Sequence, residues 1–592
     1  MKASTPHGAR SSAATPHNVL DRFGFVLAVV TENALLELAQ RLLALDDSID
    51  WGPNPQLSVG EYNYGAFHIL FPILVDGISK WLIKVPRNGV AGKWDAKSAE
   101  AMVSEALTMA YIYHTSRNQP GLRELPIPRV VAYSDTVTNS LSCAYIAISY
   151  IDGLPLHSVW YGHRLSPDKF DAATAPKRRS RTLEGLAEVQ AQLGQYSYPR
   201  GGMLRFAPYP TVDGHTFVVG SPPPRLVEVG AARLPDQEEM LRVAVQANKP
   251  ASSPANSGDK NRDSANKTNR QPKLLPLMLH RLLAARKGHG IAGASMLRGR
   301  STWLGTGGHA DVDEDRGLVS RIHSVPHQES GSMDGNTSST TETDVIYYTW
   351  GPLSDTHAYF TRPLDLHPPT HPYQKGVHKL LRLLISWIPD TPSSETVNDR
   401  FVLAHPDLNM QNIIVAEDGT LLGLIDWDNV SAVPRALGNE CYPSFLTRDW
   451  DPNVYSWVPA MEDDGYVLDP DSSLMWEDSP QSLREQRVLY LQMLSEMQKK
   501  TSPFTAFYRD LCQQSVVVEN IFLAAYDPMS RIQIIQKVVS ESWKAYEKST
   551  GRDLTHLSSY KLYDLINNGE IEGSVLVELE KAFHELLKSV DG

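Results

Sequence analysis

The chain has 592 residues, a formal net charge of −12 and 42% hydrophobic residues. This length allows roughly two to four domains, and the negative charge argues against nucleic acid as a partner. Its three cysteines, Cys143, Cys441 and Cys512, are too widely spaced to indicate a disulfide framework or a zinc site. No apolar stretch reaches the ~18 residues of a membrane span, and the first twenty residues lack the apolar core of a secretory signal. We therefore expect a cytoplasmic protein without stable membrane association.

The first folded segment is expected to begin after a disordered N-terminus, residues 1–20. Gly60-Glu-Tyr-Asn-Tyr-Gly-Ala-Phe67 precedes two predicted strands, 67–75 and 78–85, which Asp76-Gly77 joins. Backbone N–H groups around Gly60 and Gly65 would suit the phosphates of a nucleotide. An ordinary β-turn explains the same glycine spacing equally well.

A lysine and a glutamate form the next predicted pair. Lys84 lies near the end of the apolar strand Trp81-Leu-Ile-Lys-Val-Pro86, where an unpaired ammonium is costly to bury. A helix is predicted over 95–114 with Asp95 as its N-cap, and it places Glu105 on the same face as Met102 and Met109. A glutamate in an apolar stripe needs a cationic partner. Lys84–Glu105 is therefore the predicted pair, and a Lys–Glu pair that joins a strand to a helix is the device by which kinases position nucleotide phosphates.

The middle of the chain interrupts the folded pattern. A buried strand is predicted within Ala144–Gly153. Further along the chain, residues 236–344 are rich in polar residues and local charge blocks, which predicts a disordered insertion. Within it, 274–286 is a short basic amphipathic stretch. A transient helix in a linker is the favoured interpretation, and contact with an anionic surface is the alternative.

A β-hairpin with three polar residues at its open end follows the insertion. Asn412-Ile-Ile-Val415 and Leu421–Ile425 are short apolar runs, and the Asp418-Gly419 turn between them predicts an antiparallel hairpin. Pairing about Gly419 places Asn412 opposite Asp426, which brings together the oxygen ligands that Mg²⁺ prefers. Asp407 lies on the entering loop, where it can face a substrate hydroxyl. The alternative is an ordinary surface hairpin.

These residues carry a resemblance to the aminoglycoside phosphotransferase / choline kinase superfamily, and within it to the fungal group. The family's catalytic loop reads His-Gly-Asp-x-x-x-x-Asn and is followed by a strand that ends Ile-Asp-Trp. This chain has His405-Pro-Asp407, Asn412 and Ile425-Asp426-Trp427, with Pro406 where the family has glycine. The segments 55–235 and 346–460, about half the chain, take part in the resemblance.

The resemblance implies an α+β fold like that of protein kinases. A small N-terminal lobe would hold an antiparallel sheet and one helix, and a larger, mainly helical C-terminal lobe would contain the disordered insertion. It implies that Asp407 is the catalytic base, that Asn412 and Asp426 bind Mg²⁺, and that main-chain groups around Ser149 and Ile151 bind the adenine of ATP. The expected divisions are 1–20, 21–150 (N-terminal lobe), 151–235 (first part of the C-terminal lobe), 236–344 (insertion), 345–460 (catalytic part) and 461–592 (helical extension).

The acceptor substrate is the least constrained feature. Residues 449–480 hold nine acidic residues with Trp and Tyr interleaved, a composition that suits a cationic alcohol. A solvated acidic loop is the favoured alternative.

We therefore expect an ATP- and Mg²⁺-dependent phosphotransferase that acts on the hydroxyl of a small molecule. The alternative is a noncatalytic kinase-like protein that binds a nucleotide or metabolite. A protein kinase is disfavoured because no Ala-Pro-Glu segment follows Asp426.

Overall fold

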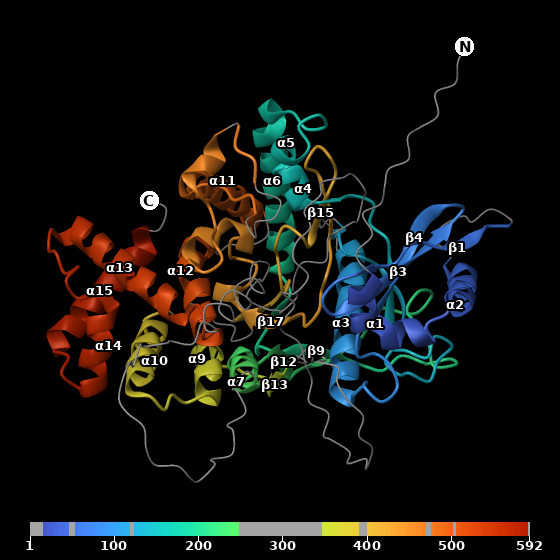
Figure 1. Ribbon diagram of the computed structural model, residues 1–592, viewed down its shortest axis with the longest axis horizontal. Coiled ribbons are helices and arrows are strands. Elements are labelled where there is room, and N and C mark those ends of the chain that lie inside the picture. Colours follow the sequence, from blue (N-terminus) through green and yellow to red (C-terminus); the bar gives the residue numbers. More distant parts are fainter. Residues whose placement is uncertain are drawn as a thin grey trace, which may run out of the picture.

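The computed structural model describes residues 16–46, 54–118, 124–247, 346–389, 400–463, 465–468, 475–500 and 505–589. It is a mixed α+β fold in which an antiparallel sheet lies at one end and helices dominate the other (Figure 1). The helices are α1 (Pro16–Val29), α2 (Glu32–Leu45), α3 (Ala96–Asn118), α4 (Leu156–Trp160), α5 (Gly162–Leu165), α6 (Ala175–Leu193), α7 (Gln237–Ala247), α9 (Thr356–Leu366), α10 (Pro372–Ser386), α11 (Pro480–Lys499), α12 (Thr505–Tyr526), α13 (Arg531–Thr550), α14 (Ser559–Asn568) and α15 (Gly573–Ser589).

The largest sheet has seven strands and the order β1-β3-β4-β6-β5-β10, with β2 paired to β3. Its strands are β1 (Leu57–Val59), β2 (Asn63–Tyr64), β3 (His68–Val75), β4 (Ile78–Pro86), β5 (Val130–Ser134), β6 (Tyr145–Ser149) and β10 (Thr216–Phe217). Small sheets and ladders elsewhere contain β7 (Leu154–Pro155), β8 (Ser197–Tyr198), β9 (Met203–Phe206), β11 (Leu226–Gly230), β12 (Ala232–Pro235), β13 (Tyr347–Trp350), β14 (Phe401–Ala404), β15 (Ile413–Val415), β16 (Leu421–Leu424) and β17 (Ser431–Pro434).

Successive side chains along β4 point to opposite faces of the sheet, so its apolar side chains are divided between two hydrophobic cores. Trp81 and Ile83 face a core that α1 and α2 cover, where Leu38 and Leu42 are fully buried. Leu82 faces the opposite core, which includes the buried side of α3 and extends through the rest of the molecule. The sheet end therefore carries three helices rather than the one that was predicted, because the amphipathic pair α1–α2 buries the second face of the sheet.

Two predicted boundaries need correction. Residues 16–20 were predicted to be disordered but belong to α1, and residues 237–247, at the start of the predicted insertion, form α7. The chain then resumes at β13, which pairs with β12 in register Ala232↔Trp350. The rest of the predicted insertion, including 274–286, and residues 1–15 lie outside the described residues.

No single helix in the described ranges is long and apolar enough to cross a membrane. The bent pair of segments Arg22–Val29 and Glu32–Leu45 passes this test of length and composition only when its two parts are taken together across a 68° bend.

The C-terminal helices form a layered packing at the far end from the sheet (Figure 1). Helix α10 packs on α14, and α13 packs on α15. Gly376 of α10 lies against the backbone of α14: a Cβ atom there would be 2.4 Å from the carbonyl oxygen of Tyr563. This close approach requires a residue without a side chain.

Substitution of Gly376 by alanine should therefore destabilise the protein. The helices would have to separate, which we expect to lower the free energy of unfolding by about 1–3 kcal/mol. Gly573→Ala is the matched control, because a Cβ atom at that helical position meets nothing within 4 Å. Urea unfolding of both variants measures the difference; equal stabilities would contradict the packing described for α10 and α14.

Candidate active site

Lys84 is the centre of the polar cluster where the sheet meets the rest of the molecule. Its strand β4 pairs with β3 and β6, so Lys84 lies opposite Leu70 on one side and Ile146 on the other. The Lys84 Nζ donates to Glu105 Oε1 at 2.8 Å, and both side chains are buried. The predicted pair is therefore present. Asp95 also caps α3 as predicted, since its Oδ1 accepts from the Lys97 and Ser98 N–H groups at 2.9 and 3.0 Å.

The same ammonium group reaches across the molecule to the hairpin β15–β16. Lys84 Nζ lies 3.4 Å from Asp426 Oδ1 and also donates to Asp428 Oδ1. Although burial acts to lower it, the pKa of Lys84 is raised well above its usual range by Asp428, Glu105 and Asp426. Lys84 therefore remains an ammonium group, held by carboxylates from two distant parts of the sequence.

Asp426 is aimed at Lys84 by an unusual backbone conformation. Strand β16 ends at Leu424, and Asp426 and Asn429 have φ angles of +67° and +63°. Such left-handed conformations are uncommon outside glycine, although Asp and Asn tolerate them best. They turn the chain sharply, so that Asp426 and Asp428 both reach the same ammonium group. Strain of this kind clusters at functional sites.

The hairpin register differs by one residue from the prediction. Ile413 pairs with Leu424, and the Ile425 N–H donates to the Asn412 carbonyl oxygen at 2.9 Å. Asn412 therefore lies opposite Ile425, not opposite Asp426 as predicted. The turn is centred on Asp418 rather than on Gly419, because Val415 pairs with Leu421. The irregularity between Ile414 and Val415 then offsets one residue of the resulting difference.

Asp407 and Asn412 are buried together at the open end of the hairpin. The Asn412 Nδ2 donates to the Asp407 carbonyl oxygen at 3.0 Å and to its Oδ2 at 3.1 Å. The side-chain oxygen of Asn412 thus points away from Asp407 and suits a hard cation. Among the described residues, no three His, Cys, Asp or Glu side chains form a ready-made metal site. Asn412 and Asp426 offer an amide oxygen and a carboxylate, the donor types that could hold a divalent cation.

His405 ties the loop that bears Asp407 to the strand that leads to Asp426. Its Nδ1 accepts the Asp407 N–H at 3.2 Å, so Nε2 carries the proton and donates to the Ile425 carbonyl oxygen at 3.0 Å. Burial lowers the pKa of His405 to about 4, which keeps the ring neutral. The backbone on either side of Pro406 is therefore fixed by one histidine.

The two predicted glycines do not offer their N–H groups to a phosphate. Gly60 N–H donates to the Pro72 carbonyl oxygen at 2.8 Å, and Gly65 N–H donates to the His68 carbonyl oxygen at 2.9 Å. Both amides are thus used within the sheet, as the β-turn alternative predicted.

The predicted adenine-binding segment lies at the end of β6. The Ser149 N–H donates to the Arg129 carbonyl oxygen at 2.8 Å, so it is already bonded inside the protein. Ile151 packs directly over Gly423 of β16, where a Cβ atom would lie 2.4 Å from its Cδ1. This segment therefore joins the sheet to the hairpin.

His68 and Asp428 are site residues whose contacts the sequence did not predict. His68, the first residue of β3, has its Nδ1 3.3 Å from Asp428 Oδ2. Burial lowers the pKa of His68 to about 4. Burial acts to raise the pKa of Asp428, but His68 and Lys84 hold it below its usual range. Burial and Asp428 together raise the pKa of Glu105, because carboxyl groups crowded around one ammonium oppose each other's ionisation.

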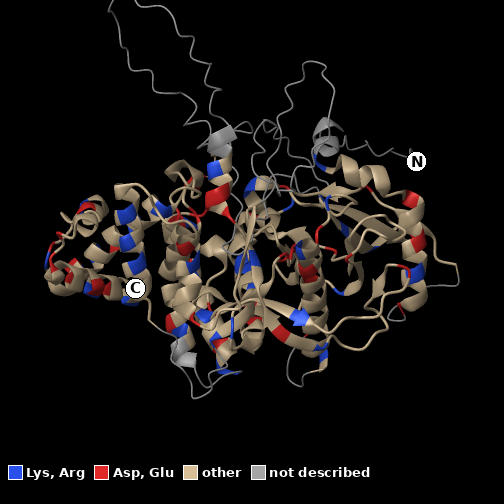
Figure 2. Ribbon diagram, turned by 90° about the horizontal axis from the view of Figure 1, so that it is seen from below, with Lys and Arg blue, Asp and Glu red and all other residues tan. Residues whose placement is uncertain are grey.

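Several acids of the segment 449–480 have partners within the protein. Asp449 lies 2.8 Å from Arg487, Asp478 lies 3.0 Å from Arg179, and Glu477 pairs with Arg448. The buried Asp451 accepts from the Ser530 Oγ at 3.1 Å. Figure 2 shows acidic and basic residues interspersed over the described elements. The buried acids are thus structural, while Glu462 and Asp463 are exposed, and Asp464 and 469–474 lie outside the described residues.

Comparisons of the chain with protein-family models, curated proteins and solved structures gave no match. The functional assignment therefore depends on the side chains that converge on Lys84 and on the loop that bears Asp407.

Proposed function

We propose that the chain is an ATP- and Mg²⁺-dependent phosphotransferase that moves the γ-phosphoryl group of ATP to a hydroxyl of a small molecule. In this proposal the sheet end and the helical end correspond to the two lobes of a kinase-like fold. The observation that supports it most strongly is the position of Lys84, between Glu105 on one side and Asp426 on the other. A buried lysine held between a helix glutamate and a strand-end aspartate matches the phosphate- and metal-binding groups of kinases.

Each residue has a distinct role in this proposal. Lys84 holds the nucleotide phosphates, and Glu105 fixes the direction of its ammonium group. Asn412 and Asp426 hold Mg²⁺, which when bound neutralises charge on the transferred phosphoryl group. Asp407 accepts the proton of the acceptor hydroxyl and is kept in place by Asn412. The proposal names no cationic acceptor, because three of the acids expected to bind one, Asp449, Glu477 and Asp478, are paired with arginines.

A screen of small-molecule alcohols with ATP and Mg²⁺, read by mass spectrometry, tests the proposal. A product heavier by one phosphoryl group, formed by the parent and lost in Asp426→Asn, is the expected result. The Gly60 and Gly65 amides are bonded inside the protein, which leaves them no part in phosphoryl transfer and favours a second candidate, a noncatalytic kinase-like protein that binds a nucleotide or metabolite. Binding of ATP without any phosphorylated product across the screen would support that candidate.

Asp428 should compete with nucleotide phosphates for Lys84. Asp428 Oδ1 accepts a hydrogen bond from the Lys84 ammonium group, and Asp428 Oδ2 lies 3.3 Å from His68 Nδ1. Asp428 therefore binds the same ammonium group that a nucleotide phosphate would need. We expect Asp428→Asn to bind ATP about 3- to 10-fold more tightly in EDTA, because a neutral amide holds the ammonium group less strongly. Isothermal titration measures this. Weaker binding in EDTA would contradict the competition, and weaker binding only with Mg²⁺ would indicate a metal-binding role for Asp428.

A further inference from the structure

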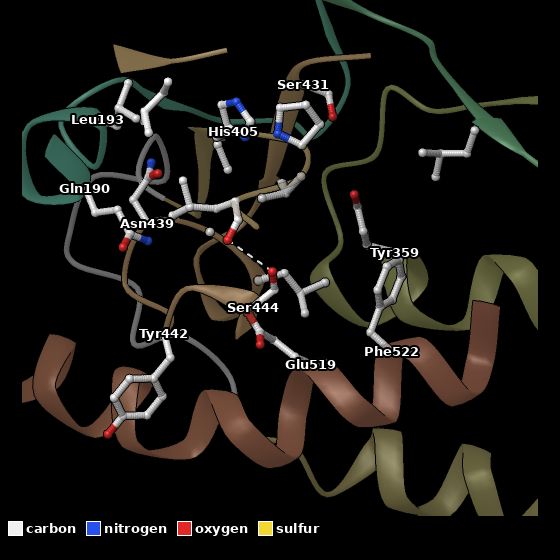
Figure 3. Close-up of a pocket in the computed structure, with 18 residues that line it drawn as sticks. Gln190, Leu193, Tyr359, His405, Ser431, Asn439, Tyr442, Ser444, Glu519 and Phe522 are labelled. Carbon is white, nitrogen blue, oxygen red and sulfur yellow. Dashed lines mark hydrogen bonds between the residues drawn. The ribbon is translucent and has the colours of Figure 1, made fainter. Parts of the chain in front are cut away.

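A cavity of about 60 Å³ lies beneath the loop that bears Asp407. His405, Pro406 and Leu408 contribute to its wall, and α12 contributes Glu519 and Phe522 (Figure 3). The remaining wall is mostly apolar, with residues from α6, α9, β12, β14, β16 and β17. By volume the cavity has room for roughly four non-hydrogen atoms, since one water needs about 10–15 Å³ of such space.

Glu519 is a buried carboxyl group that faces this cavity. Its side chain rises from α12 toward Ser444 (Figure 3), and the residue is 6% exposed. Within the described residues its Oε2 has no hydrogen-bond partner. Burial raises the pKa of Glu519 to about 8, although the thiol of Cys441 acts in the opposite direction. Below that pH the carboxyl group is neutral, so it can donate one hydrogen bond and accept another.

Several neighbouring polar side chains already have partners elsewhere. The Ser444 Oγ donates to the Leu408 carbonyl oxygen at 3.0 Å, and the Gln190 Nε2 donates to the Cys441 carbonyl oxygen at 3.2 Å. The Asn439 Nδ2 donates to the Leu403 carbonyl oxygen at 2.5 Å. A buried carboxyl oxygen without a partner lowers stability. A ligand that supplies the missing hydrogen bonds is therefore favoured at this position.

We propose that this cavity is a binding site for a small uncharged ligand with an adjacent donor and acceptor, such as a primary amide, held by two hydrogen bonds to Glu519. A neutral ligand suits the apolar wall, because a charged one would lose its hydration there. Leu408, Leu437 and Ser444 are the partly exposed residues of the lining, which places the entrance beside them. The site is separate from the Lys84 cluster and does not depend on the phosphotransferase proposal. Its occupant would support the loop that bears Asp407.

Acetamide is the probe, and the melting temperature of the full chain without nucleotide is the measurement. We expect a saturable rise at pH 6.5 that disappears above about pH 8, where Glu519 ionises. Glu519→Gln keeps a donor and an acceptor, so its rise should persist and become independent of pH. Glu519→Leu should show no rise. Asp510→Asn, an exposed carboxylate on the same helix, is the matched control and should behave like the parent.

Three outcomes would overturn the proposal. The first is no saturable rise with acetamide in the parent. The second is a rise with methylammonium in place of acetamide, which would indicate an ionised Glu519 and a site for cations. The third is an acetamide effect in the parent that does not change between pH 6.5 and pH 9.5. This last comparison decides the question even if Glu519→Leu does not fold.

Discussion

Asp407→Asn should lower the turnover of the phosphorylated product by about 10²- to 10⁴-fold, the usual contribution of a general base. An amide cannot take up the proton of the substrate hydroxyl, but it has nearly the same shape as the carboxylate. Its oxygen can still accept from Asn412, which donates to Asp407 Oδ2 at 3.1 Å. The loop and the affinity for Mg·ATP should therefore stay unchanged.

Asp418→Asn is the matched control for this substitution. Asp418 lies on the turn of the same hairpin, where it is exposed and pairs with Arg181. It should retain the activity of the parent. Steady-state kinetics and titration calorimetry on both variants separate turnover from nucleotide binding. If Asp407→Asn keeps parental turnover, Asp407 is not the base.

Lys84→Met should have the second large effect, on both nucleotide binding and stability. Loss of charge-assisted hydrogen bonds to phosphate should weaken ATP binding by about 10- to 100-fold. The carboxylates of Glu105, Asp426 and Asp428 would also lose their common cation, and removal of one partner of a buried ion pair costs about 3–5 kcal/mol. Because only ionised carboxylates repel, this loss of stability should grow as the pH rises.

A double variant separates the two roles of Lys84. Lys84→Met with Glu105→Leu removes both members of the buried pair, so it should recover part of the lost stability. It should not recover ATP binding, because the phosphate-binding ammonium group is still absent. Unfolding in urea and titration with ATP provide the two measurements. Recovery of ATP binding in the double variant would show that Lys84 has only a structural role.

The sequence predicts the pair Lys84–Glu105 well because a charged residue in an apolar stripe requires a buried partner. The same signal is present at Glu519, which together with Asn520 interrupts the apolar run 516–523. Helical periodicity likewise predicts α3, where Met102, Glu105 and Met109 share one face and are all buried.

Other features depend on geometry that residue patterns do not encode. The hairpin register differs by one residue because the turn is centred on Asp418 rather than on Gly419, and the irregularity in β15 offsets only part of this difference. The contact between His68 and Asp428 depends on the left-handed conformation of Asp426, and no spacing rule indicates it. The internal pairing of the acids in 449–480 depends on arginines as distant in sequence as Arg179.

The melting temperature with and without Mg·ATP tests the central claim most directly, with the parent compared to Asp426→Asn. Asparagine tolerates the left-handed conformation of Asp426, so the variant should fold while its metal-binding charge is lost. We expect Mg·ATP to raise the melting temperature of the parent, ATP in EDTA to raise it less, and Asp426→Asn to show little rise with Mg·ATP. An equal rise in the parent and in Asp426→Asn, or no rise in either, would contradict a Mg·ATP site at Lys84 and Asp426.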